Sequence, residues 1–298
     1  MMDHPNDRNG TVSTARRGCS PALLDKDAWA AQKQWELEDV YAQINAAAEQ
    51  MIGGGELFRN YLDVQARFDR YSVGNAILIT LQHPTATRLA DYHAWMECGA
   101  HIKKDEPGIV ILEPGKEYRR EDGGSGVYYH VKKVYDISQT SYQYHVSRAT
   151  AADAEQLIRT LAVISPCDIR VTNVLPEGAD ACYHKGQDRI LLRQGMDAAA
   201  VFRGLSQALA RVYMARSRYR FANPVFSACC VSYMLCRRNG IAVDQFSFVH
   251  LPKAIRRLNA QTLRRELRLI REVAGELSAD MKREAAAQRD CAVTEAQT

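Results

Sequence analysis

Cationic and aromatic side chains recur between residues 70 and 133, at positions where a hydrophobic core would not need them. Aromatic rings can stack on nucleotide bases, which is worth about 1–3 kcal/mol per base, and Lys and Arg side chains bind phosphates. Such a mixture is typical of a surface that holds a single nucleic-acid strand. The candidate contact residues are Arg70, Tyr71, Asn75, Arg88, Tyr92, Trp95, Lys103, Lys104, Lys132 and Lys133.

Several of these candidates also have a purely structural interpretation. Tyr92 and Trp95 are three residues apart, which is the spacing of core positions on one face of a helix. The pair Lys103-Lys104 falls between a helix and a turn, where lysines are often only solvated. Asn75 and Gln82 are amides in an otherwise apolar helix, and a buried unpaired amide costs about 1–3 kcal/mol. We therefore favour a role for both amides in locking a hairpin to the helices over direct ligand contact.

The elements that would position these residues can be read from periodicity and turn signals. Pro84 ends the third of the expected helices, Thr87 could cap the next one, and Gly99 provides a C-terminal stop. Helices are expected over 29–45, 56–68, 72–81 and 89–98, a buried strand over 109–112, and a second strand over 127–135 after a glycine-rich loop at 123–126. Together these elements predict a small α+β domain.

The second half of the sequence predicts a mostly helical unit with a short sheet, so the whole chain is expected to be of the α+β class. Helices are expected over 150–163, 197–216 and 223–238, and strands over 169–171, 181–184 and 189–192. A further helix rich in arginine follows Pro252. Beyond residue 275 the composition turns to Ala, Glu, Gln and Asp, and we expect a flexible tail.

Composition limits the class of protein. The 298 residues suit two globular units, and the formal charge of +4 with a pI near 8.6 indicates only a slight attraction to polyanions. Eight cysteines occur without a CxxC pair and without a secretory signal, which predicts reduced thiols and a cytoplasmic protein. No apolar run approaches the ~18 residues that a membrane span needs, so no membrane partner is expected.

The order of residues in the first half carries a resemblance to a known family. The segment from Phe68 to Pro114 and its closing segment Val134–Thr140 resemble the N-terminal domain of ArdC-type antirestriction proteins and their LtrC-like relatives. This resemblance implies a single-stranded DNA-binding domain joined to a zincin-like, zinc metallopeptidase domain that bears an HExxH motif. The expected division is a disordered leader at 1–28, a DNA-binding domain at 29–147, a peptidase-like domain at 148–275 and a tail at 276–298.

The metal-binding motif that the resemblance implies is missing from this sequence. HExxH supplies two imidazole ligands one helical turn apart and a glutamate that acts as general base. The corresponding helix reads Ser206-Gln207-Ala208-Leu209-Ala210, and the next helix, where relatives carry an acidic third ligand, offers only residues such as Ser227 and Cys229. We therefore expect no metal, no cofactor and no catalysis. Ser206, Gln207, Ala210, Ser227 and Cys229 are interpreted as positions of a degenerate metal site.

The sequence hypothesis is thus a non-enzymatic protein of a bacterial mobile or conjugative element that binds single-stranded DNA, with antirestriction as a candidate role. Two alternatives stay open. One is a zinc metallopeptidase with atypical ligands, and the other is a pseudoenzyme whose second domain binds a protein partner.

Overall fold

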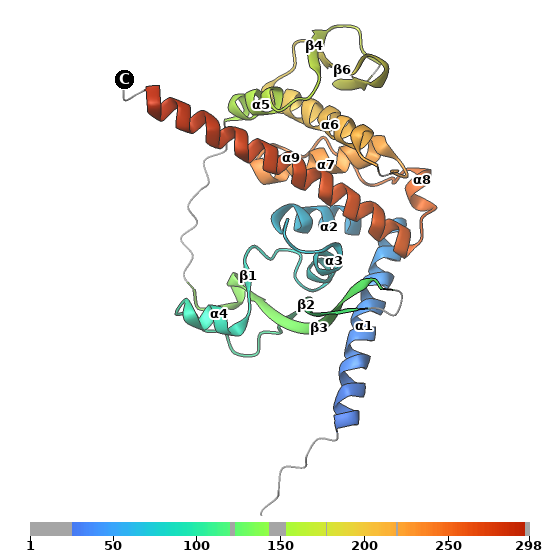
Figure 1. Cartoon of the computed structure of the whole chain (residues 1–298), viewed down its shortest axis with the longest axis vertical. Helices are drawn as coiled ribbons and strands as arrows, with labels where there is room; N and C mark the ends of the chain where they lie inside the picture. The colour runs from blue at the N-terminus through green and yellow to red at the C-terminus, as the bar shows by residue number, and fades with distance from the viewer. Residues whose placement is uncertain (1–25, 120–122, 143–152, 177, 219, 296–298) are drawn as a thin grey trace, which may run out of the picture.

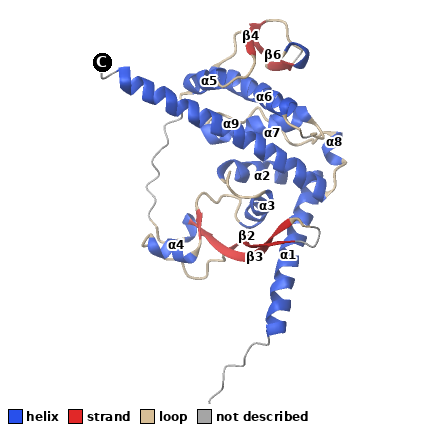
Figure 2. Cartoon of the chain, viewed as in Figure 1, coloured by secondary structure: helices blue, strands red, loops and turns tan. Residues whose placement is uncertain are grey.

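Helices make up most of the molecule, and each half contributes one small sheet. The computed structural model describes residues 26–119, 123–142, 153–176, 178–218 and 220–295. Figure 2 shows two short sheets, separated by a layered set of helices. The α+β class predicted from the sequence is confirmed.

The first half places three helices before its sheet. In chain order it contains α1 (Lys26–Gly53), α2 (Gly55–Arg67), α3 (Val73–Gln82), β1 (Leu89–Ala90), α4 (Tyr92–Glu97), β2 (Ile109–Arg119), β3 (Ser125–Asp136) and a short 3-10 helix (Ile137–Gln139). Local signals set several of these ends. At the start of α3, the Ser72 hydroxyl accepts a hydrogen bond from the backbone N–H of Asn75. After α4, Gly99 takes a positive φ.

The cap of α4 differs from the predicted one. Asp91 caps this helix, because its carboxylate accepts a hydrogen bond from the Ala94 amide at 2.9 Å. Thr87, the predicted cap, instead donates its backbone N–H to the carboxylate of Asp136. The two residues before the cap, Leu89 and Ala90, form the short strand β1 rather than the first turn of the helix.

The first sheet has the order β1-β3-β2, and both pairs are antiparallel. β2 was expected to end before Pro114, but it continues to Arg119, with a shift in register between Pro114 and Glu117. Proline lacks the N–H that a ladder needs, so it is tolerated only at sheet edges and bulges. Pro114 meets both conditions, because β2 is an edge strand and the irregularity begins at this residue.

The second half follows the predicted order of helix, strand, hairpin and helix. Its elements are α5 (Ala154–Val163), β4 (Asp168–Thr172), β5 (Ala181–His184), a 3-10 turn (Lys185–Gln187), β6 (Arg189–Arg193), α6 (Ala198–Arg216), α7 (Pro224–Asn239), α8 (Lys253–Arg256) and α9 (Ala260–Glu295). β6 is the central strand, parallel to β4 and antiparallel to β5. Asp197 and Asn223 cap α6 and α7 through their side-chain oxygens, as acceptors at helix starts typically do.

The two halves share one hydrophobic core. A single cluster of buried side chains runs from Ile77 and Leu112 in the first half to Leu209 and Leu267 in the second. α2 packs against α7, and α1 against α9, so that α9 lies between the first half and the helices α5 and α6 (Figure 1). Trp95, with Ala100 and Ile137, forms a separate small core around α4. The predicted domain boundary at 147/148 lies outside the described residues.

Both predicted chain ends can be compared with the structure only in part. Of the expected leader at 1–28, residues 1–25 lie outside the described residues, and α1 begins at Lys26. The expected flexible tail is helical as far as Glu295, because α9 continues through it. Leu277 and Met281 are buried there, which gives this part of the helix a packed face, and Ala and Glu favour the helix intrinsically. Among the described residues, none of the helices has the length and apolar character to cross a membrane.

Candidate nucleic-acid interface

A buried carboxylate holds together the segments that carry several candidate residues. Asp136, 1% exposed, accepts hydrogen bonds from the backbone N–H of Thr87 at 2.7 Å and of Arg88 at 2.9 Å. Its other oxygen accepts bonds from the backbone N–H and the hydroxyl of Ser138, at 3.0 and 2.7 Å. Burial raises the pKa of Asp136, but the hydrogen bonds from Ser138, Arg88 and Thr87 outweigh it, so the pKa lies below its usual range.

The side chain of Arg88 rests on two aromatic rings. Its guanidinium lies 5.3 Å from the centre of the Trp95 ring and 5.8 Å from the centre of the Tyr142 ring. Both distances are within the range of cation–π attraction. Because Arg88 is exposed and its backbone is bound to Asp136, the guanidinium is held in place while it remains open to solvent.

Trp95 is not the exposed platform that was predicted. The side chain is 0% exposed, and its indole N–H donates to the carbonyl of Tyr135 at 2.9 Å. The alternative interpretation, that the helical spacing of Tyr92 and Trp95 marks a core position, holds for Trp95. Tyr92 is 51% exposed, and Tyr142, which sequence reasoning had not selected, is 39% exposed.

Lys103 is hydrogen-bonded to Ser138, which also binds Asp136. Its ammonium donates to the Ser138 carbonyl at 2.7 Å, and its backbone N–H donates to the carbonyl of Gln139 at 2.9 Å. Lys104 follows directly and is exposed. We call Arg88, Lys103 and Tyr142 the Arg88 cluster. Arg88 is hydrogen-bonded to Asp136 and Lys103 to Ser138, while the ring of Tyr142 contacts the guanidinium of Arg88.

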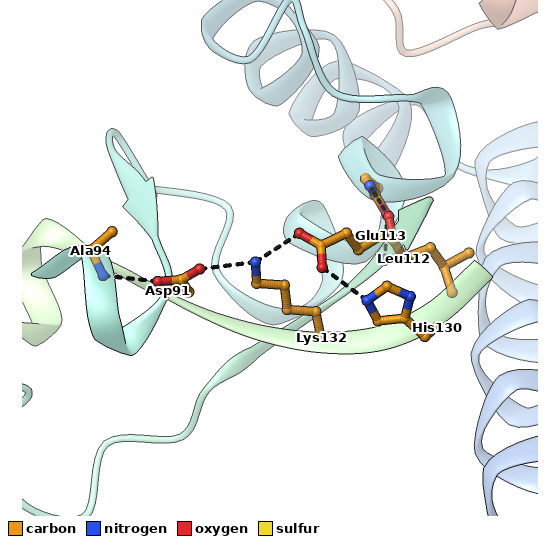
Figure 3. A network of polar contacts seen from close by, with 7 residues as sticks. Asp91, Ala94, Leu112, Glu113, His130 and Lys132 are labelled. Carbon is orange, nitrogen blue, oxygen red and sulfur yellow. Dashed lines mark hydrogen bonds and ion pairs between the residues drawn. The ribbon is translucent and has the colours of Figure 1, made fainter. Parts of the chain in front are cut away.

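Lys132 is occupied by protein carboxylates rather than open for a phosphate. Figure 3 shows its ammonium between Asp91, at 2.9 Å, and Glu113, at 2.7 Å, while Glu113 also binds His130 at 2.8 Å. The hydrogen bonds to Asp91 and Glu113 raise the pKa of Lys132. This network ties the hairpin to the start of α4, so Lys132 has a structural position and is withdrawn from the candidate surface.

Asn75 and Gln82 pair with the free edge of β2. The Asn75 amide donates to the Leu112 carbonyl at 2.9 Å and accepts from the Leu112 N–H at 2.8 Å. Gln82 makes the same two bonds with Val110, at 3.0 and 2.8 Å. The two side chains lie two helical turns apart on α3 and bind the backbone N–H and carbonyl groups of alternate residues of β2. These bonds confirm the predicted structural role of both amides in holding the hairpin to the helix. Asn75 is 7% exposed and is not placed to contact a strand of DNA.

The remaining predicted contacts lie apart from the Arg88 cluster. Arg70 is exposed before α3, and Tyr71 beside it is partly buried, which raises the pKa of its phenol. The Tyr71 carbonyl accepts a hydrogen bond from Arg271 of α9 at 3.1 Å. Lys133 is exposed on β3, with its aliphatic stem against Gly108. Among the described residues, no hydrogen bond or ring contact joins these side chains to the cluster.

A second aromatic group lies on the far part of the hairpin. Tyr128 is 61% exposed and Tyr129 43% exposed, and the ring of Tyr128 packs 4.3 Å, centre to centre, from that of Tyr118. Lys116 and Arg119 are exposed on the neighbouring strand. The signal for this group was present in the sequence. Consecutive residues of a strand point to opposite faces, so at least one tyrosine of the pair Tyr128-Tyr129 had to leave the packed face.

In the second half, the positions where HExxH would provide its ligands are filled by uncharged contacts. Ser206 is 0% exposed, and its hydroxyl bonds to the Ser232 hydroxyl at 2.8 Å and donates to the Arg203 carbonyl at 3.0 Å. Ala210, one turn later, is also fully buried and has no donor atom in its side chain. Gln207 lines a cavity of about 660 Å³ together with Cys229.

The following helix offers no better set of ligands. The Ser227 hydroxyl donates to Glu266 of α9 at 2.6 Å, and this buried carboxylate also accepts the N–H of Ala222 at 3.0 Å. Burial raises the pKa of the Cys229 thiol to about 11, which favours the protonated form over the thiolate that binds metals. Within the described ranges, no three His, Cys, Asp or Glu side chains gather at one point as metal ligands would.

The comparisons with known proteins bear on the first half. Residues 29–155 match the family model described as the N-terminal domain of anti-restriction factor ArdC. This segment is therefore similar to the N-terminal domain of ArdC. The match begins within α1 and ends within α5, so it contains the Arg88 cluster and the hairpin but none of the five degenerate metal-site positions.

Two solved structures of the antirestriction protein ArdC from the R388 plasmid also resemble the chain. The metal-free structure is 19% identical, covering 73% of this chain and 86% of its own, with a TM-score of 0.49. The Mn(II)-bound structure is 21% identical, covering 76% of this chain and 98% of its own, with a TM-score of 0.48. No curated protein matches the sequence.

Proposed function

We propose that the chain binds single-stranded DNA through its ArdC-type domain, as an antirestriction accessory protein of a bacterial mobile element. The observation that carries the proposal is the Arg88 cluster. It presents a guanidinium that lies over the buried ring of Trp95 and the exposed ring of Tyr142, and it includes the ammonium of Lys103. The family name and the plasmid origin of the R388 protein support the antirestriction role.

The chemistry of the cluster suits a strand whose bases are accessible. A guanidinium is planar, always charged and able to donate two parallel hydrogen bonds to a phosphate. Because the Arg88 guanidinium already rests on the two rings, its side chain loses less conformational entropy when it binds a phosphate. Tyr142, and Tyr92 on the neighbouring helix α4, are exposed enough to stack on bases, whereas the bases of a duplex are already stacked on one another.

The second half is proposed to be non-catalytic. A catalytic zinc site uses three protein ligands and a general base to activate its water. The Ser206 hydroxyl is hydrogen-bonded to the Ser232 hydroxyl and the Arg203 carbonyl. Ala210 has no ligand atom in its side chain, and Gln207 has no carboxylate to act as the base.

Two alternatives rest on the cavity that Gln207 and Cys229 line beside the edge strand β5. One is an atypical zinc metallopeptidase, and the other is a site for a protein partner. Stoichiometric zinc in the purified protein, lost together with a peptidase activity on chelation, would favour the first. A partner that is bound equally well by the free protein and by its DNA complex would favour the second.

The proposed surface is tested by removing Arg88 and measuring the affinity for a labelled oligothymidylate by fluorescence anisotropy. Arg88→Gln should weaken binding by about 10- to 150-fold, because a hydrogen bond to a charged group contributes about 1.5–3 kcal/mol. Arg88→Lys should recover only part of this loss, since it restores the charge but not the planar contact with the rings.

Lys33→Gln is the matched control, because Lys33 is an exposed cation of α1 that pairs with Glu36 and lies outside the Arg88 cluster. It should bind within about twofold of the unmodified chain. Equal affinities for Arg88→Gln and Lys33→Gln would overturn the assignment of the Arg88 cluster.

A further inference from the structure

A large cleft lies where the first half of the molecule meets the second. Its volume is about 1260 Å³, and its walls come from the end of α2, from α5, from the end of α7 and from α9. Small-molecule pockets measure about 300–1,000 Å³. The size of this cleft therefore suits part of a chain molecule better than a single small ligand.

The described lining of the cleft is strongly cationic. It contains five cationic side chains and one carboxylate, that of Asp69. The cations are Arg67, Arg237, Arg238, Lys282 and Arg289. They are brought together only by the fold, since they come from three helices that are distant in sequence. A cleft with one sign of charge between protein walls concentrates counter-ions, and here it favours anions.

Three of these cations are held in fixed positions. Arg238 donates to the carbonyls of Ala66 and Ala274 at 3.0 and 3.2 Å and to the Ser278 hydroxyl at 2.8 Å. Arg67 donates to the Pro84 carbonyl, and Arg237 pairs with Asp63 at 2.7 Å. These contacts connect α2, α7 and α9 and give the cleft a preformed wall.

Helix ends explain part of this charge but not all of it. Arg67 lies in the last turn of α2, and Arg237 and Arg238 lie in the last turn of α7, where cations offset the partial negative charge of the helix. Lys282 has no such role, because it lies well inside α9 and is exposed. It also has no ion-pair partner among the residues that the structure describes.

Burial has a cost for two of the arginines in the cleft. It lowers the pKa of Arg67, while the charge of Asp63 acts against this effect and that of Arg237 adds to it. Burial likewise lowers the pKa of Arg238, where Asp69 acts against the effect and Arg271 adds to it. An anion between these side chains and α9 would act in the same direction as Asp63 and Asp69, because opposite charge stabilises the protonated form.

The cleft also adjoins the Arg88 cluster directly. Thr87 lines the cleft, and the next residue along the chain is Arg88. Both backbone N–H groups are bound to Asp136, so the two surfaces are joined by a fixed segment. The backbone of this segment therefore links the cleft to the residue that carries the Arg88 guanidinium.

We propose that this cleft binds the phosphates of the same DNA strand, so that Lys282 and Arg289 of the second half complete the binding surface. The inference rests on the proposed function of the first half and assigns to the second half a role in binding rather than catalysis. Each lost phosphate contact should reduce the slope of log affinity against log salt by about 0.7 for a single strand.

The test compares two double variants of the full chain, using a labelled oligothymidylate of about 20 nucleotides over a salt series. Lys282→Gln with Arg289→Gln should weaken binding by at least about tenfold at low salt and reduce the slope by about 1.4. The control is Lys253→Gln with Arg283→Gln, which removes two exposed charges that do not line the cleft. It should change the affinity by less than about threefold.

The possible outcomes separate the two proposals. Equal affinity and slope in the two double variants, with binding still weakened by Arg88→Gln, would overturn the inference about the cleft and leave the proposed function standing. Absence of binding by the unmodified chain would overturn both. A thermal melt of each variant checks that the folded state is retained, which is expected because the substituted side chains are exposed or partly exposed.

Discussion

At the scale of single residues, Asp136 fixes the loop that carries Arg88. The carboxylate is buried and accepts four hydrogen bonds, which explains why the segment Val134–Thr140 contains polar residues that a plain strand end would not need. The sequence alone could not name Thr87 and Arg88 as partners of Asp136, because they lie 49 and 48 positions away in the chain.

The lowered pKa of Asp136 predicts how stability depends on pH. A carboxyl whose pKa is lower in the folded state than in the unfolded one, about 3.9, stabilises the fold above that value. This contribution is lost as the pH falls from about 4 through the lower folded pKa. Asp136→Asn should therefore be less stable than the unmodified chain by roughly 2–3 kcal/mol at pH 7, with the gap narrowing below about pH 4.

Urea unfolding at pH 7 and at several values below pH 4 measures this gap. Lys33→Gln serves as a reference for a substitution outside the network. A gap in the free energy of unfolding that is constant over this range would contradict the view that the ionised carboxylate holds the segment.

Residue-scale errors in the sequence analysis share one physical cause. Lys132 looked like a phosphate contact, but the register of the hairpin pairs Glu113 with His130, diagonally across from Lys132, and the cap of α4 brings Asp91. Trp95 looked like a platform, but α4 turns its indole toward the Tyr135 carbonyl. Both contacts join residues that are distant in the chain, so their partners could not be named from the sequence, although the helical spacing of Tyr92 and Trp95 did indicate a core position for Trp95.

At the scale of elements, most helices and strands could be predicted because their signals are local. Asp197 and Asn223 begin α6 and α7 at the expected residues, and hydrophobic periodicity identified β4, β5 and β6. Besides the cap of α4, the predictions failed at Pro114, within an edge strand, and in the last part of α9. In both places tertiary context decided the outcome, through the bulge in one case and burial of Leu277 in the other.

The contact between α3 and β2 gives a prediction at this scale. Asn75→Ala would leave the N–H and carbonyl of Leu112 without partners in a buried position, and we expect a loss of about 2–4 kcal/mol in the free energy of unfolding. Gln82→Ala should cost less than about 1.5 kcal/mol, because water can reach the edge at Val110.

Chemical unfolding of the two variants under the same conditions measures the difference. Because both substitutions remove an amide from the same helix, loss of side-chain helix preference does not explain a large difference between them. An equal or smaller cost for Asn75→Ala would show that this amide does not lock the hairpin to the helix.

At the scale of the whole molecule, the two halves share one hydrophobic core, so the proposed binding surface would lie on a single packed unit. The shared core sets α9 beside the first half, and this arrangement brings Lys282 to the same cleft as Arg67. A net charge of +4 understates the local field, because cations gather along the cleft and the Arg88 cluster. The sequence indicated a resemblance to the ArdC N-terminal domain and several candidate cations, but the cleft depends on packing between distant helices and could not be predicted.

The most direct test of the central claim is the affinity of the unmodified chain for a single-stranded oligothymidylate, measured by fluorescence anisotropy from low to physiological salt. The account predicts binding that weakens linearly in log affinity against log salt, with a slope set by several phosphate contacts, and weaker binding to a duplex of the same length. No binding at low salt, or equal affinity for strand and duplex, would contradict it.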